Sequence, residues 1–155
     1  MNVRDRPAPG LSFPILVLLA LIAAPRVVLH DLGVIEEGTF VNALFVFVPP
    51  LVWIVVVLWR RLPHPFLTLL VVGVLYGVML MLGHQLLWTA AHEGAPPTLG
   101  GNLADLSPGV QQGIIRVFAA LSSLVTGTVV GALCGLVAWA ASKALPKPAT
   151  MRPGT

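Results

Sequence analysis

Six polar side chains stand near the ends of four long apolar stretches, where a polar site inside an otherwise apolar protein could be built. An arginine in such a place can bind an anion, and a histidine can bind a ligand or relay a proton near neutral pH. The six residues are Arg26, His30, Asn42, His84, Gln85 and Arg116. We predict that they form one polar cluster in the outer third of the protein.

A structural role is the alternative interpretation of the same residues. Each arginine could extend to a helix end and pair with an acidic loop residue, which would clamp the loop to the helices. His84 could simply hydrogen bond to a neighbouring helix. The acidic candidates for such pairs are Asp31, Glu36, Glu37 and Asp105.

Helical periodicity turns two of the six residues toward neighbouring helices. At about 100° per residue, His84 falls within roughly 20° of Gly73 and Gly77 on a helical wheel. Arg116 falls within roughly 20° of Gly127 in the same way. Small residues at four-residue spacing let a neighbouring backbone come close, and a second stripe of them is Ser123, Gly127, Gly131 and Gly135. We therefore predict that the two stripes are helix-packing surfaces and that His84 and Arg116 extend them.

The histidines and acids at this end of the chain do not form a recognised metal motif. The residues that could contribute ligands are His30, His84, His92, Glu37 and Glu93, and their spacing matches no known set. The single cysteine, Cys134, excludes an internal disulfide and the paired thiols of quinone-linked membrane oxidoreductases. No nucleophile or pair of acids marks a catalytic centre. We expect no catalytic residue, metal site or cofactor.

Four apolar stretches must position these side chains. They cover 11–30, 40–59, 66–88 and 118–141, each about the 20 residues that cross a hydrocarbon core. The chain is 57% hydrophobic and only 10% charged, whereas soluble domains are about a quarter charged. We predict an all-α polytopic membrane protein, a bundle of four transmembrane helices over 11–143. The lead 1–10 and the tail 144–155 are predicted to be disordered.

Charged residues divide between the two ends of the predicted bundle. Basic residues flank one side: Arg4, Arg6, Arg60, Arg61, Lys143, Lys147 and Arg152. Acidic residues lie on the other: Asp31, Glu36, Glu37, Glu93 and Asp105. Because cytoplasmic loops carry excess Lys and Arg, both termini are predicted to be cytoplasmic. The composition is typical of a GC-rich bacterial genome, so we expect the inner membrane.

Two consecutive prolines mark the second stretch. Pro49 and Pro50 have no amide N–H, so we predict a helix break that leaves the carbonyls of Phe45 and Val46 without their usual donors. Broken helices often line water-filled cavities. Ser107 and Pro108, by contrast, predict the start of a helix, because serine followed by proline is typical of the first helical position. The last helix is therefore predicted to be longer than a bilayer requires.

The predicted function is that of a small non-enzymatic membrane-complex subunit or homo-oligomer, assembled through the glycine stripe of the last helix. One alternative is a small channel or transporter with an outward-facing polar vestibule. A second is a histidine-based membrane metal protein or enzyme. The expected partners are the lipid bilayer and either further copies or another membrane protein. Nucleic acid is excluded, because the basic residues sit at span ends and not on a soluble face.

Overall fold

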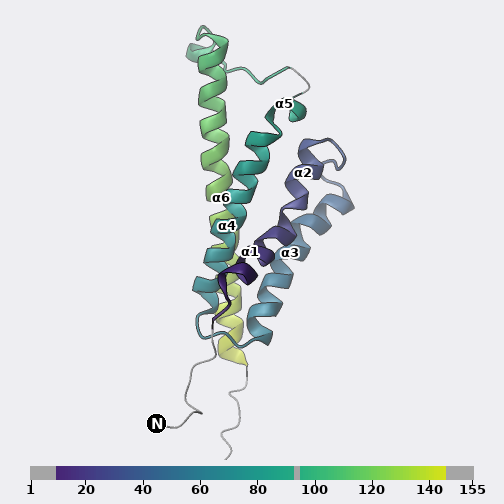
Figure 1. Cartoon of the computed structure of the whole chain (residues 1–155), viewed down its shortest axis with the longest axis vertical. Coiled ribbons are helices and arrows are strands. Elements are labelled where there is room, and N and C mark those ends of the chain that lie inside the picture. The colour runs from purple at the N-terminus through teal and green to yellow at the C-terminus, as the bar shows by residue number, and fades with distance from the viewer. Residues whose placement is uncertain (1–9, 93–94, 146–155) are drawn as a thin grey trace, which may run out of the picture.

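The structure, a computed structural model, describes residues 10–92 and 95–145. All regular secondary structure in these two ranges is helical, which confirms the all-α prediction for this part of the chain. The elements are α1 (Phe13–Ala23), α2 (Pro25–Asp31), α3 (Phe40–Trp59), α4 (Pro65–Leu86), α5 (Trp88–Ala91), the 3-10 helix η2 (Gly101–Leu103) and α6 (Pro108–Ala144) (Figure 1). The predicted lead and tail lie outside the described residues, apart from Gly10, Ala144 and Leu145.

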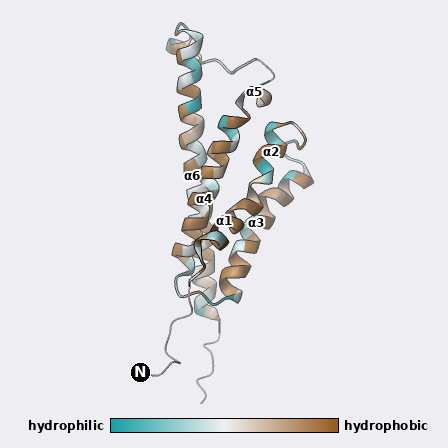
Figure 2. Ribbon diagram, in the orientation of Figure 1, coloured by the Kyte–Doolittle hydropathy of each residue, from teal (hydrophilic) through white to brown (hydrophobic). Residues whose placement is uncertain are grey.

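Four helical segments are long and apolar enough to cross a membrane. They are Phe13–Asp31, Phe40–Trp59, Pro65–Leu86 and Pro108–Ala144, and an 18-residue stretch within each has a mean hydropathy between 2.0 and 2.5. Figure 2 shows hydrophobic residues along most of each helix and hydrophilic ones gathered toward the helix ends. The last segment has 37 residues, which corresponds to about 55 Å at 1.5 Å per residue. Figure 1 shows its first turns extending past α5.

Charge distinguishes the two ends of the molecule. Arg60 and Arg61 follow α3, and Lys143 lies in the last turn of α6; we call this the basic end. Asp31 ends α2 at the opposite end, where Glu36, Glu37 and Asp105 also lie; we call this the acidic end. Figure 1 shows α2 and α3 leaning away from α4 and α6 toward the acidic end.

The interruption by proline occurs in the first span, not in the second. α1 ends at Ala23 and α2 begins at Pro25, where the Ala24 N–H bonds to the Leu21 carbonyl at 3.1 Å. α3, by contrast, is α-helical through Pro49 and Pro50. The break predicted there is therefore not seen. The φ of proline is compatible with a helix, and Pro49 is buried among neighbouring side chains, so packing holds the turn in place.

The glycine stripes of α4 and α6 face each other. A Cβ atom built on Gly131 would lie 2.6 Å from the Cα atom of Gly73, and one on Gly135 would lie 2.9 Å from the Phe66 carbonyl oxygen. A Cβ on Gly127 would collide with the Gly77 backbone. The α4–α6 contact is the most extensive between helices in the described chain. Since the stripe is filled by α4 of the same chain, it does not offer a free surface to a second copy.

A buried core holds the first three helices against α4. Trp53 is fully buried and donates its indole N–H to the Leu19 carbonyl at 2.7 Å. Its ring meets the ring of Tyr76 edge to face, with centroids 5.7 Å apart. This contact ties α1, α3 and α4 together and fixes where the polar residues nearer the acidic end can lie.

Candidate functional site

A buried carboxylate at the acidic end links α2 to α4. Asp31 is the last residue of α2, and His84 lies in the last turn of α4. Asp31 Oδ2 lies 2.7 Å from His84 Nδ1, and the Asp31 side chain is only 6% exposed. The proximity of Gly83 to α2 permits this pair, because a Cβ atom at Gly83 would lie 2.8 Å from Val27 Cγ1.

The same carboxylate connects to the surface through His30. The second oxygen of Asp31 lies 3.5 Å from His30 Nδ1, and His30 Nε2 lies 3.3 Å from Glu37 Oε1. The Glu37 side chain is 79% exposed. Four titratable groups in a row therefore run from the protein surface to His84.

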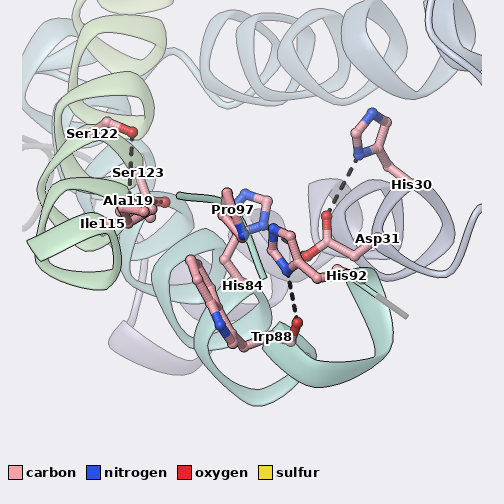
Figure 3. A pocket seen from close by; sticks show the side chains of 11 residues that line it. His30, Asp31, His84, Trp88, His92, Pro97, Ile115, Ala119, Ser122 and Ser123 are labelled. Atoms are coloured by element: carbon pink, nitrogen blue, oxygen red, sulfur yellow. Dashed lines mark hydrogen bonds and ion pairs between the residues drawn. The ribbon is translucent and has the colours of Figure 1, made fainter. Parts of the chain in front are cut away.

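A pocket of about 390 Å³ opens beside Asp31 and His84 (Figure 3). We call it the histidine pocket; its lining residues are His30, Asp31, His84, Trp88, Ala91, His92, Pro97, Ile115, Ala119, Ser122 and Ser123. The His84 and His92 rings lie between α2, which carries Asp31, and α6, which carries Ser122 and Ser123. Three imidazoles, a carboxylate and two hydroxyls can thus hydrogen bond with a polar solute of modest size.

A layered stack of side chains closes one wall of the histidine pocket. The Arg116 guanidinium carbon lies 5.0 Å from the centre of the Trp88 ring, a cation–π contact. The His92 ring centre is 4.5 Å from that of Trp88, and His92 Nδ1 lies 2.8 Å from the Trp88 carbonyl oxygen. In addition, Gln85 donates to the Arg116 carbonyl at 3.0 Å. Arg116 and Gln85 therefore support the wall and do not line the pocket.

Pairing of the arginines with acidic loop residues is not seen in the described part of the chain. Arg116 packs on the ring of Trp88, the first residue of α5. Arg26 donates through Nε to the Asn42 amide oxygen at 3.0 Å. Both ion-pair predictions are therefore wrong for these residues, and Glu93 lies outside them. Asp31 is the acidic residue of the site, and it pairs with His30 and His84 and not with an arginine.

Arg26 borders a second, smaller cavity of about 190 Å³. We call it the arginine pocket; its lining residues are Ala23, Arg26, Phe45, Val46, Pro50, Trp53, Tyr76, Thr126 and Val130. Tyr76 borders this cavity together with Arg26, and the charge of Arg26 acts on its hydroxyl. Asn42 is held in place because its own N–H bonds to Thr39 Oγ1 at 3.2 Å, in the cap of α3.

The six predicted polar residues thus fall into three pairs and not one cluster. His30 and His84 line the histidine pocket, Arg26 and Asn42 meet beside the arginine pocket, and Gln85 and Arg116 join α4 to α6. The residues that sequence reasoning missed as site residues are Asp31, Trp88, Tyr76, Ser122 and Thr126. Tyr76 lies eight residues before His84 and is thus turned about 80° from it on a helical wheel, so periodicity alone does not indicate it.

The described residues contain no group of three or more His, Cys, Asp or Glu side chains that could hold a metal ion. The fold and the two pockets define a class: an all-helical protein with four candidate membrane spans and polar cavities between them. Comparison with protein-family models, with curated proteins and with solved structures finds no match to this chain.

Proposed function

We propose that the protein is a small bacterial inner-membrane channel or transporter whose histidine pocket is a vestibule open to the outer side. In this proposal the four long helices cross the bilayer as a bundle, with both termini in the cytoplasm. The charge distribution supports this orientation, because Arg60, Arg61 and Lys143 lie at one end and the acidic residues at the other. The multi-pass membrane class itself follows from the length and hydropathy of the helices.

The observation that carries the proposal is the Asp31–His84 pair in the wall of a pocket. A carboxylate with a 6% exposed side chain is costly to hold near hydrocarbon, and such residues are usually found where they serve a binding site or a polar pathway. Hydroxyls of Ser122 and Ser123 face the pair across the cavity. Dissolved solutes can exchange protons or hydrogen bonds with this wall without meeting lipid.

Uptake of three labelled probes into proteoliposomes tests the vestibule. Urea, choline and iodide represent neutral, cationic and anionic solutes, and we expect at least one to enter faster than into protein-free vesicles. His84→Leu should lower that uptake about tenfold, as the loss of one charge-assisted hydrogen bond implies. His64→Leu, at an exposed position of the basic end, is the matched control. Equal uptake of all three probes with and without protein would contradict the proposal.

Assembly with a second copy of the chain is a second candidate function, supported by the exposed start of α6. Gly109 and Gly113 have no neighbouring atom within 4 Å of an added Cβ, so this four-residue glycine spacing is open. Val110, Ile114 and Val117 beside them are exposed. Such a surface, and not the filled stripe around Gly131, is the one available for helix association.

Gly113→Leu tests this second candidate. Native mass spectrometry of the protein from nanodiscs should show dimers for the natural chain and monomers for the variant, because leucine would hold the two backbones apart. An unchanged distribution of masses would remove this candidate. The variant should have normal secondary structure by circular dichroism in either case.

A further inference from the structure

We propose that the arginine pocket is a binding site for a small anion, placed next to the histidine pocket on the same pathway. The pathway rests on the proposed function, whereas anion binding at Arg26 can be measured without transport. The site is built by α1, α2, α3, α4 and α6 together, so no single helix terminus accounts for it.

The charge of Arg26 is the first reason. Arg26 lies inside the first candidate span, one residue after the start of α2, and no ion pair involves it within the described residues. Its side-chain hydrogen bond goes to the neutral side-chain amide of Asn42. A guanidinium has five N–H donors, and an uncompensated charge away from water is costly. An anion in the adjoining cavity would supply the missing negative charge.

The donors that border the cavity are the second reason. Tyr76 borders the cavity beside Arg26, and its phenolic hydroxyl can donate its O–H to a ligand. The hydroxyl of Thr126 borders the same space. A volume of about 190 Å³ has room for a halide or small carboxylate with some of its water, because one water occupies about 30 Å³ in the liquid.

Backbone acceptors are the competing explanation for Arg26. Phe45 and Val46 border the pocket, and Pro49 and Pro50 deprive their carbonyls of the helical N–H donors. In the described chain, however, the side-chain hydrogen bond of Arg26 goes to Asn42 and not to these carbonyls. The guanidinium is therefore available to a ligand.

The two pockets follow one face of α6. Ser122 lines the histidine pocket and Thr126 the arginine pocket, one helical turn or about 6 Å apart along the axis. On α4, Tyr76 and His84 are eight residues, or about 12 Å, apart along the axis, with Leu80 midway between them in the sequence. Val27 lies between Arg26 and His30 on α2. Val27 and Leu80 are only 3% and 4% exposed and belong to the same buried core, so on the proposed pathway we assign them the barrier between the two pockets.

Quenching of Trp53 fluorescence tests the anion site, because the Trp53 ring borders the arginine pocket. The full chain carries Trp59→Phe, Trp88→Phe and Trp139→Phe, so that Trp53 is the one fluorophore. Iodide should quench it with saturation, whereas caesium should not. Arg26→Gln should raise the half-saturating iodide concentration about tenfold or more, since a charge-assisted contact is lost. Arg60→Gln, which removes an exposed charge at the basic end, should leave it unchanged.

Two further variants keep the test decisive if Arg26→Gln fails to fold. Arg26→Lys retains the charge and should retain saturable quenching, and Tyr76→Phe should weaken it several-fold. Iodide quenching that matches caesium, or that persists in Arg26→Gln, would overturn the anion site. Loss of the iodide site with intact probe uptake would leave the proposed function standing. Saturable iodide binding without uptake of any probe would support the anion site and contradict the proposed pathway.

Discussion

Gly131→Leu is expected to prevent α4 and α6 from packing and to lower the melting temperature of the purified protein by about 10 °C or more. The reason is that the atoms nearest to position 131 are backbone. An added Cβ would lie 2.6 Å from both the Gly73 Cα atom and the Leu69 carbonyl oxygen. Neither atom can rotate away as a flexible side chain could, so the helices must separate. Thermal unfolding in detergent, followed by size-exclusion chromatography, measures the effect.

Gly113→Leu is the matched control for this prediction, since it places the same side chain on the same helix. An added Cβ at Gly113 meets no atom within 4 Å, so the melting temperature of the monomer should change little. Exchange of glycine for leucine also favours helix formation at both positions alike. If Gly131→Leu melted at the temperature of the control, the close contact of the two helices would be refuted.

Asp31→Asn is the second substitution from which we expect a large effect. It removes the negative charge that His84 and His30 share while it preserves the size of the side chain. We expect a loss of about 1–3 kcal/mol in the free energy of unfolding, because the carboxylate is buried while its histidine partners are partly exposed. Probe uptake through the histidine pocket should fall together with stability, because α2 is no longer held against α4.

Glu36→Gln provides the comparison, because it removes one negative charge from an exposed position five residues away. Its stability and its probe uptake should match those of the natural chain, since an exposed charge contributes little. Chemical unfolding monitored by circular dichroism, together with uptake measurements on both variants, decides the matter. Equal behaviour of Asp31→Asn and Glu36→Gln would show that the buried carboxylate has no special role.

Packing of the last two long helices could be predicted because it follows from a local regularity. Four-residue spacing puts Gly127 and Gly131 on one side of any helix, and small residues invite a close partner. α6 also begins at Pro108 as predicted, since serine followed by proline is a local signal. Such features depend on a few neighbouring residues and not on the tertiary structure.

The prolines show where such reasoning fails. Pro25 ends a helix whereas Pro49 and Pro50 do not, although each lacks an N–H. The difference lies in the packing around each proline, which depends on residues far along the chain. Trp53 in the same helix, for example, is held by the Leu19 carbonyl, 34 positions earlier. Local propensity is readily overridden by such contacts.

The site was predicted in its residue types but not in its partners. Asp31 was assigned to a loop as a partner for an arginine, yet it ends α2 and pairs with His84. Arg116 contacts Trp88, which follows the end of α4 at Leu86 and begins the separate helix α5, and helical periodicity does not predict such a break. To predict which side chains pair across helices, one must know how the helices tilt and how they are shifted along their axes. The spacing of apolar residues gives neither quantity.

The proline at position 25 has a mechanical consequence. It separates a seven-residue helix from α1, and this short helix carries Arg26 at one end and His30 and Asp31 at the other. Those residues belong to different pockets, yet they share one rigid body. A tilt of α2 about Ala24 would therefore displace Arg26 in one pocket and His30 and Asp31 in the other at the same time.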